Sequence, residues 1–190
     1  MKQAATNGEA RQSSAVFSEA ALEHLDALYG YALTLTRDQT EAEDLVQETY
    51  LRAVGAFGQL VPNSNLKGWL FVIMRNVWLN QLRHTKSGPR FVELQGEDGN
   101  RAFQTKGSSA DPYLVYVRKL ERAEVQAAIA GLPCLYREII VLRDIEGFSY
   151  QEISAMLSCP AGTVMSCLGR AREKLRRALA SWQRATAKAV

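Results

Sequence analysis

A run of cationic side chains near the C-terminal end of the chain is the strongest chemical signal in the sequence. Its members are Arg170, Arg172, Lys174, Arg176 and Arg177, with Glu173 as the one acid among them. Guanidinium and ammonium groups at this density bind phosphates, and an arginine can also read a guanine edge through two hydrogen bonds. A charge run alone is usually a solvated helix face, so its meaning depends on the segment in front of it.

Residues 149–182 read as two helices joined by a short turn. Ser149 and Glu152 have the spacing of a capping box, and Pro160 suits the first turn of the second helix. That helix has an apolar stripe formed by Val164, Leu168, Ala171, Leu175, Ala178 and Trp182. The arrangement predicts a helix-turn-helix, whose second helix enters the DNA major groove. The expected DNA contacts are Thr163, Met165, Ser166, Gly169, Arg170, Arg172, Lys174 and Arg176.

A second polar constellation lies on a helix expected from about residue 67 to 83. Asn76 and Asn80 are four residues apart, so their amides share one face and can bond to base edges. Trp69 and Ile73 are core residues by default, although Trp69 could stack on a base. A loop with small polar side chains, Asn63, Ser64 and Asn65, precedes the helix. The candidate residues are Asn63, Ser64, Asn65, Trp69, Arg75, Asn76, Asn80 and Arg83.

The helix before that loop has an acidic outer face over residues 41–48. We expect Thr40 and Glu43 to form its capping pair. The side chains expected to point inward are Ala42, Leu45, Val46, Thr49, Tyr50, Ala53 and Phe57. Taken alone, this pattern is typical of an ordinary soluble helix surface.

These segments together resemble the extracytoplasmic-function (ECF) sigma factors of bacterial RNA polymerase. The promoter-binding motifs of that family are matched at residues 149–153, 162–164 and 170–172, and residues 44–53 resemble its polymerase-binding helix. Both halves occur in the family's order and are separated by a polar segment. The sequence departs from the family at Cys167, where arginine is usual. We expect this position on the flank of the recognition helix, where restoring arginine should tighten DNA binding.

The resemblance implies the partners and the roles of the residues. Asp44, Leu45, Gln47 and Glu48 would dock on the clamp coiled coil of core RNA polymerase. The asparagine-bearing helix and the loop before it would bind the minus-ten promoter element with its bases unpaired. The second domain would bind the polymerase flap and read the minus-thirty-five element with the helix from Pro160. An anti-sigma factor, often membrane-bound in the family, would cover these surfaces.

The expected fold class is all-α, with two small helical domains joined by a flexible linker, the C-terminal one a helix-turn-helix. We expect a disordered tail at residues 1–15, a first domain at 16–85, a linker at 86–112 and a second domain at 113–190. The first helix should run from Phe17 and point Phe17, Ala21, Leu25, Leu28, Ala32 and Leu35 inward. Later helices are expected over residues 113–129 and 134–145, the second ending at Gly147.

Composition favours a binding protein over an enzyme. The sequence has no phosphate-binding glycine loop, no metal triad and no nucleophile with a plausible histidine partner. Cys134, Cys159 and Cys167 lack metal-ligand spacing and read as reduced thiols, so no cofactor, metal or small-molecule substrate is expected. There is no apolar leader or membrane span, which favours the cytoplasm. The main rival is a dimeric helix-turn-helix regulator, which would leave the N-terminal half unexplained.

Overall fold

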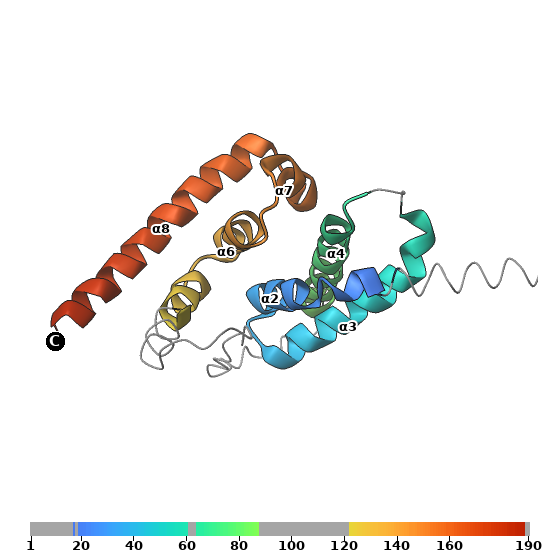
Figure 1. Cartoon of the computed structure of the whole chain (residues 1–190), viewed down its shortest axis with the longest axis horizontal. Coiled ribbons are helices and arrows are strands. Elements are labelled where there is room, and N and C mark those ends of the chain that lie inside the picture. The colour runs from blue at the N-terminus through green and yellow to red at the C-terminus, as the bar shows by residue number, and fades with distance from the viewer. Residues whose placement is uncertain (1–16, 18, 61–63, 88–121, 189–190) are drawn as a thin grey trace, which may run out of the picture. The chain divides into compact units, whose positions relative to one another are not determined.

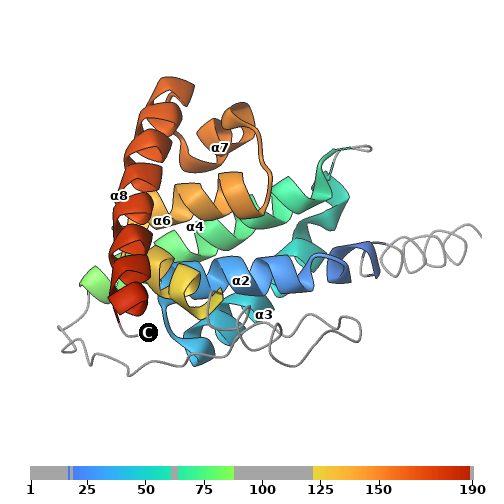
Figure 2. The same ribbon diagram turned by 60° about the vertical axis from the view of Figure 1, so that its left-hand side comes forward.

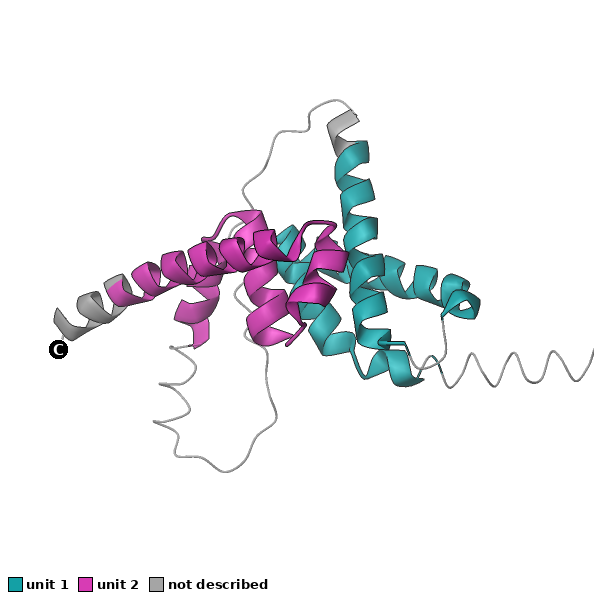
Figure 3. Cartoon of the chain, turned by 90° about the horizontal axis from the view of Figure 1, so that it is seen from above, with its two compact units in different colours: residues 1–94 teal, residues 95–190 magenta. Residues whose placement is uncertain are grey.

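The computed structural model describes residue 17 and residues 19–60, 64–87 and 122–188, with side chains up to residues 84 and 180 in the last two ranges. Every regular element within these ranges is helical, in agreement with the expected all-α class (Figure 1). The chain divides into two compact units, residues 1–94 and 95–190 (Figure 3). The expected tail and residues 88–112 of the expected linker lie outside the described residues.

Unit 1 is built on three helices that all pack against one another. They are α2 (Leu25–Thr36), α3 (Gln39–Ala56) and α4 (Leu66–Ser87), with a 3-10 turn, η1 (Phe57–Gln59), after α3. The rings of Tyr31 and Phe71 stack with their centres 4.8 Å apart at the junction of α2 and α4. The most deeply buried side chains around them are Leu28, Leu45, Leu70, Met74 and Val77. This core fixes which faces of α3 and α4 remain outside.

Two details of unit 1 differ from the sequence expectation. The helix expected to continue from Phe17 to Leu35 is interrupted by a turn at residues 23–24, and Leu25 is 40% exposed instead of inward. The N-terminus of α3 is capped by Asp38, whose carboxylate accepts from the Glu41 N–H at 2.8 Å, so the Thr40 assignment is wrong. Asp38 has extended backbone geometry that aims its side chain at the free N–H groups, whereas Thr40 already lies inside the helix.

Unit 2 contains a helix at residues 122–130 followed by α6 (Cys134–Ile140), η2 (Val141–Ile145), α7 (Tyr150–Leu157) and α8 (Ala161–Lys188). The long helix α8 packs against both α6 and α7 (Figure 2). The core of unit 2 is formed by Leu132, Ile139, Ile140, Val141, Leu142, Phe148, Ile153, Met156, Leu157, Val164, Leu168 and Ala171. The part of the helix expected at residues 113–121 is outside the described residues.

The joints of unit 2 follow local sequence signals in part. The capping box is confirmed: the Glu152 N–H donates to Ser149 Oγ, and the Ser149 N–H donates to the Glu152 carboxylate. Pro160 is the cap of α8 and not its first residue, since the Val164 N–H bonds to its carbonyl at 3.2 Å. The helix expected over residues 134–145 widens at η2 into a π-helical turn before Gly147, whose φ is +80°.

Candidate functional site

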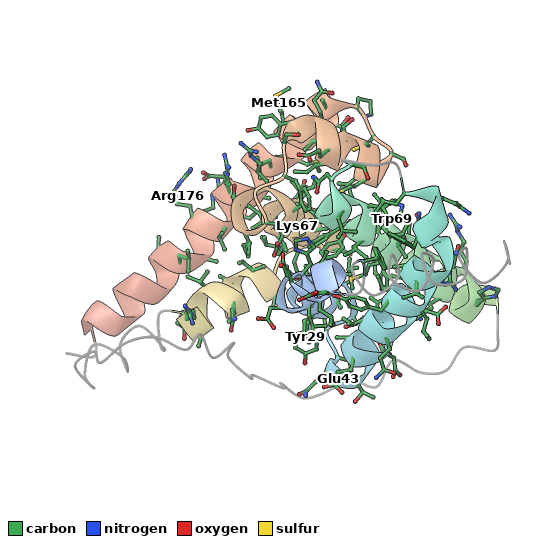
Figure 4. The ribbon with its side chains drawn as sticks, turned by 45° about the vertical axis from the view of Figure 1, so that its right-hand side comes forward. Tyr29, Glu43, Lys67, Trp69, Met165 and Arg176 are labelled. Carbon is green, nitrogen blue, oxygen red and sulfur yellow. The ribbon has the colours of Figure 1, made fainter. Side chains whose placement is uncertain are left out.

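The outward face of α8 carries most of the side chains expected to contact DNA. Thr163, Ser166, Gly169 and Arg170 are all exposed, and Met165 is 52% exposed. Figure 4 shows Met165 and Arg176 projecting away from the helix. The Ser166 hydroxyl donates to the Thr163 carbonyl at 3.0 Å, which holds it close to the first turn. The structure therefore brings these side chains together on one surface that the core does not use.

Gly169 interrupts this surface with a spot that has no side chain. A Cβ atom built there would meet nothing within 4 Å, so packing inside unit 2 does not require glycine. Glycine inside a helix is destabilising by about 0.5–1 kcal/mol relative to alanine. A glycine without a packing reason on an exposed face suits the close approach of a binding partner to the backbone.

The cations of α8 are less available than the sequence indicates. Arg172 makes two hydrogen bonds to Asp144 of η2, at 3.1 and 2.5 Å, and Asp144 raises the pKa of the guanidinium. Glu173 binds both Arg176 and Arg177, the latter at 2.8 Å. Asp144, 28 residues before Arg172 in the sequence, therefore opposes the run together with Glu173. In the described part of the chain, the cations of the run without an ion pair are Arg170 and Lys174.

Cys167 does not occupy the position that the sequence comparison assigns to it. Its side chain is 8% exposed and belongs to the buried side of α8, with Val164, Leu168 and Ala171. It does not lie on an accessible flank, so an arginine there would have to leave the packed face before it could reach a phosphate. The buried stripe weakens earlier than expected, since Leu175 is half-buried and Ala178 is exposed. The side chain of Trp182 lies outside the described residues.

The two asparagines of α4 lie near each other on the surface of unit 1, as expected. Asn76 is exposed, Asn80 is half-buried, and the Arg83 guanidinium donates to Asn80 Oδ1 at 3.0 Å. This bond leaves the Asn80 amide N–H₂ group to face a partner. Arg75 is half-buried on the same helix.

One residue of the loop before α4 caps that helix. Asn65 caps α4, since its Oδ1 accepts from the Gly68 N–H at 3.0 Å, while Ser64 is exposed. Trp69 follows one turn later and is half-buried, with its ring edge-on to Phe17 at 6.1 Å (Figure 4). Ile73 is also half-buried, so neither Trp69 nor Ile73 is a full core residue. Asn63 lies outside the described residues.

The four contacts expected on α3 differ in how exposed they are. Asp44 and Gln47 are exposed, and Glu48 is half-buried and paired with Arg52 at 2.6 Å. Leu45 is 0% exposed, so this folded unit offers no Leu45 surface to a partner. Its place in the heptad pattern, beside Ala42 and Thr49, puts it in the core and corrects its assignment as a polymerase contact.

Two apolar side chains complete the α3 surface and were missed by the sequence reasoning. Leu51 is 70% exposed and Val54 is 51% exposed. Leu51 follows Gln47 by four residues and Val54 follows Leu51 by three, so all three share one helix face. Together with Asp44 and Gln47 they form one stripe, which we call the α3 stripe. The available signal was their absence from the inward set, because large apolar residues outside a core stripe often mark a binding surface.

Two further searches of the described residues found nothing. None of the helices there is both long and apolar enough to cross a bilayer. Within the same ranges, no three histidine, cysteine or acidic side chains come close enough to hold a metal ion.

Comparison with known proteins places the chain. Residues 21–88 match the family described as sigma-70 region 2, and residues 122–175 match sigma-70 region 4. The ECF RNA polymerase sigma factor EcfG of Rhodopseudomonas palustris is 36% identical over 149 residues, which are 78% of this chain and 77% of that protein. SigE of Mycolicibacterium smegmatis is 35% identical over 186 residues, 98% of this chain and 69% of that protein.

Solved structures agree with this placement. The sigma factor RpoE of Bartonella quintana, in complex with the anti-sigma factor NepR, aligns with a TM-score of 0.66 and 30% identity, over 86% of this chain and 96% of that one. CnrH, in complex with the cytosolic domain of CnrY, aligns with a TM-score of 0.58 and 25% identity, over 90% and 95%. The chain belongs to the ECF sigma factors, which recognise promoters and initiate transcription by RNA polymerase.

Proposed function

We propose that the two units divide the work of promoter use between two helix faces of unlike chemistry. The observation that carries this proposal is that α3 exposes acid and aliphatic side chains, whereas α8 exposes polar and cationic ones. The first domain, at residues 16–85, would bind core polymerase and the minus-ten element. The second, at residues 113–190, would bind the flap and the minus-thirty-five element.

The α3 stripe is the proposed docking surface for the clamp coiled coil of core polymerase. Leu51 and Val54 would supply apolar area removed from water on docking, and each such side chain is worth about 1.5–3 kcal/mol when fully buried. Asp44 and Gln47 would supply charge and hydrogen-bonding complementarity, which governs orientation and association rate more than affinity. Glu48 lies at the edge of the stripe and would contribute after release from Arg52.

The exposed polar groups at the start and middle of α4 are the proposed minus-ten surface. Asn76 and Asn80 would bond to the edges of unpaired bases, with Arg75 and Arg83 on the adjoining phosphates. Trp69 keeps part of its ring exposed for stacking, and Ser64 lies one residue before the helix cap. Asn65 contributes by fixing the start of the helix through its cap bond.

The outward face of α8 is the proposed minus-thirty-five reader. Thr163, Met165 and Ser166 lie in its first turns, where a recognition helix meets base edges. Arg170 follows one turn after Ser166, and arginine is the commonest bidentate partner of guanine. Lys174 has no ion pair within the described residues and is the proposed phosphate contact, together with Arg176 once it leaves Glu173.

Regulation by an anti-sigma factor is part of the proposal. RpoE, the first structural relative above, was solved with the anti-sigma factor NepR, and CnrH was solved with the cytosolic domain of CnrY. An inhibitor that covers the α3 stripe or the face of α8 would block docking or promoter reading directly. The chain itself would perform no catalysis and would work in the cytoplasm, where its polymerase is.

The test of the minus-ten assignment is the double variant Asn76→Ala/Asn80→Ala in holoenzyme. Closed-complex formation should stay near the wild-type level, while permanganate reactivity of the melted strand should fall at least about tenfold, the loss of about two base-edge hydrogen bonds. Circular dichroism checks that both proteins are equally helical. Normal strand opening by a well-folded variant would remove these amides from the site.

A further inference from the structure

The π-helical turn η2 holds two neighbouring side chains of opposite charge that reach different helices of unit 2. Arg143 lies 4.8 Å from the ring centre of Tyr150 and donates to the Phe148 carbonyl at 2.7 Å. Asp144 accepts from Arg172 of α8, at 3.1 Å from Nε and 2.5 Å from Nη2. One residue thus ties η2 to the start of α7, and the next ties it to the middle of α8.

Arg143 and Asp144 both lie inside the widened turn. The Glu146 N–H bonds to the Val141 carbonyl, five residues back, at 2.9 Å. An α-helix would close four residues back and would aim the following side chains in another direction around the axis. Single π-helical turns are concentrated at functional positions in proteins. Here the turn directs Asp144 toward α8.

We propose that Arg172 is a positioning residue, which, through Asp144, fixes the orientation of α8 and so sets how sharply this sigma factor discriminates its minus-thirty-five element. Both oxygens of one carboxylate bind the planar guanidinium, an arrangement that constrains direction as well as distance. Arg172 lies about 200° around the helix from Arg170, two residues earlier. It therefore holds the helix from a flank that does not carry the proposed guanine reader. The proposal rests on the reading role of α8 proposed above.

The alternative role for Arg172 predicts effects of opposite sign. If Arg172 were a phosphate contact, Asp144 would compete with the DNA for its guanidinium. Removing the Asp144 charge would then strengthen binding to every DNA sequence and steepen the salt dependence. If Arg172 positions α8, the same change loosens the helix and weakens discrimination between sequences.

The experiment measures holoenzyme binding to two promoter duplexes at several salt concentrations. One is a promoter mapped from transcripts that overexpression induces, and the other is the same duplex with its minus-thirty-five element scrambled. For Asp144→Asn, the ratio of the two dissociation constants should shrink about twofold to fivefold, the effect of one well-oriented but partly exposed ion pair. Affinity for the scrambled duplex should stay unchanged. Tighter binding of both duplexes, with a log–log salt slope steeper by about one, would overturn the proposal.

Two more variants separate geometry from charge. Arg172→Lys keeps the charge and loses the bidentate hydrogen bond. It should therefore reduce the ratio of the dissociation constants for the scrambled and native duplexes, as Asp144→Asn does. Retention of the full ratio by Arg172→Lys would contradict the proposal. The exchange Asp144→Arg/Arg172→Asp should restore much of the ratio, because it re-forms the pair in the opposite sense, whereas a phosphate contact would be lost.

Control variants distinguish this proposal from the one on which it rests. Glu173→Gln removes an equal charge from α8 without breaking a bond between helices, so the ratio should not change. Arg170→Ala should shrink the ratio about tenfold to hundredfold if α8 reads the element. If it does so while Asp144→Asn and Arg172→Lys leave the ratio intact, only the positioning role is overturned. If Arg170→Ala also has no effect, reading by α8 fails and the positioning role fails with it.

Discussion

The exposed face of α3 in unit 1 and that of α8 in unit 2 are both helix stripes that the cores do not need, yet their chemistry differs. The α3 stripe leaves Leu51 and Val54 more than half exposed, and Glu48 at its edge pairs with Arg52 of the same helix. The α8 face is polar, and three of its five nearby cations are held by Asp144 or Glu173. Exposed aliphatic area suits a protein partner, whereas polar and cationic groups suit DNA.

The difference teaches how each surface is kept in place. Unit 1 holds α3 through neutral contacts, since Leu45 is fully buried and the Tyr50 hydroxyl donates to the Ala21 carbonyl at 2.8 Å. Unit 2 holds α8, its proposed reading helix, partly through charge, by the pair between Asp144 and Arg172. Ionic support at half-exposed positions is weakened by salt, so unit 2 should respond to ionic strength more than unit 1.

The largest expected effect concerns the aliphatic part of the α3 stripe. Leu51→Ala/Val54→Ala should weaken binding to core polymerase by about tenfold or more, because docking would bury less apolar area. The free energy of unfolding should change by less than about 0.5 kcal/mol, since both side chains are exposed. Equilibrium binding of labelled protein to core enzyme measures the first quantity, and urea titration the second.

Two comparisons sharpen that test. Leu22→Ala removes another exposed leucine, 58% exposed and outside α3, and should leave polymerase binding unchanged. Asp44→Ala/Glu48→Ala should mainly slow association, and the slowing should fade at high salt, because these charges steer the encounter. Unchanged affinity of the Leu51/Val54 variant would mean that α3 is not the docking helix.

An intermediate effect is expected at Gly169 on the α8 face. Gly169→Ala should stabilise unit 2 by about 0.5–1 kcal/mol, because alanine is the better helix former and the site is open. It should nevertheless weaken binding of holoenzyme to the promoter duplex severalfold if the DNA approaches the backbone there. Thermal unfolding and duplex titration together measure the two effects.

Gly55→Ala is the matched control for this substitution. Gly55 is an exposed glycine inside α3, and a Cβ built there also meets nothing within 4 Å. The Gly55→Ala substitution should raise the free energy of unfolding by a similar amount without changing the affinity of the holoenzyme for the duplex. A Gly169→Ala protein that is both more stable and fully able to bind DNA would place Gly169 outside the interface.

The smallest effect tests the neutral support of unit 1. The Tyr50 hydroxyl donates to the Ala21 carbonyl at 2.8 Å, and burial raises the pKa of Tyr50 above its usual value near 10. Its raised pKa in the folded state stabilises the fold below the unfolded value, and this contribution is lost as pH rises through the folded value. Stability should therefore fall at alkaline pH more steeply in the wild type than in Tyr50→Phe.

At neutral pH the hydrogen bond of Tyr50 favours the wild type. Tyr50→Phe should be less stable by about 0.5–1.5 kcal/mol, the usual net value of one hydrogen bond. Unfolding measured from pH 7 to the alkaline limit for both proteins isolates Tyr50 from the other groups that titrate there. Parallel stability curves would show that folding does not raise the pKa of Tyr50.

Sequence alone determined the helical class, the two halves and most of the surface residues. These properties depend on local periodicity and caps: Ser149 and Glu152 form the predicted box, and Asn76, Ser166 and Arg170 face outward as their spacing predicts. The spacing of apolar residues predicts which side of a helix is buried, because an apolar side packs against other elements of the fold. It therefore also separated the outer acids of α3 from its core.

Only the tertiary structure decided which neighbours those faces meet. Asp144 and Arg172 are 28 residues apart, so no local pattern could pair them. Cys167 is 8% exposed although it lies outside the apolar stripe that the spacing of α8 predicts, so its burial depends on how α8 packs in unit 2. Burial and ion pairing are set by where separate elements touch, and that is fixed by the packing of the whole unit and not by spacing along one helix.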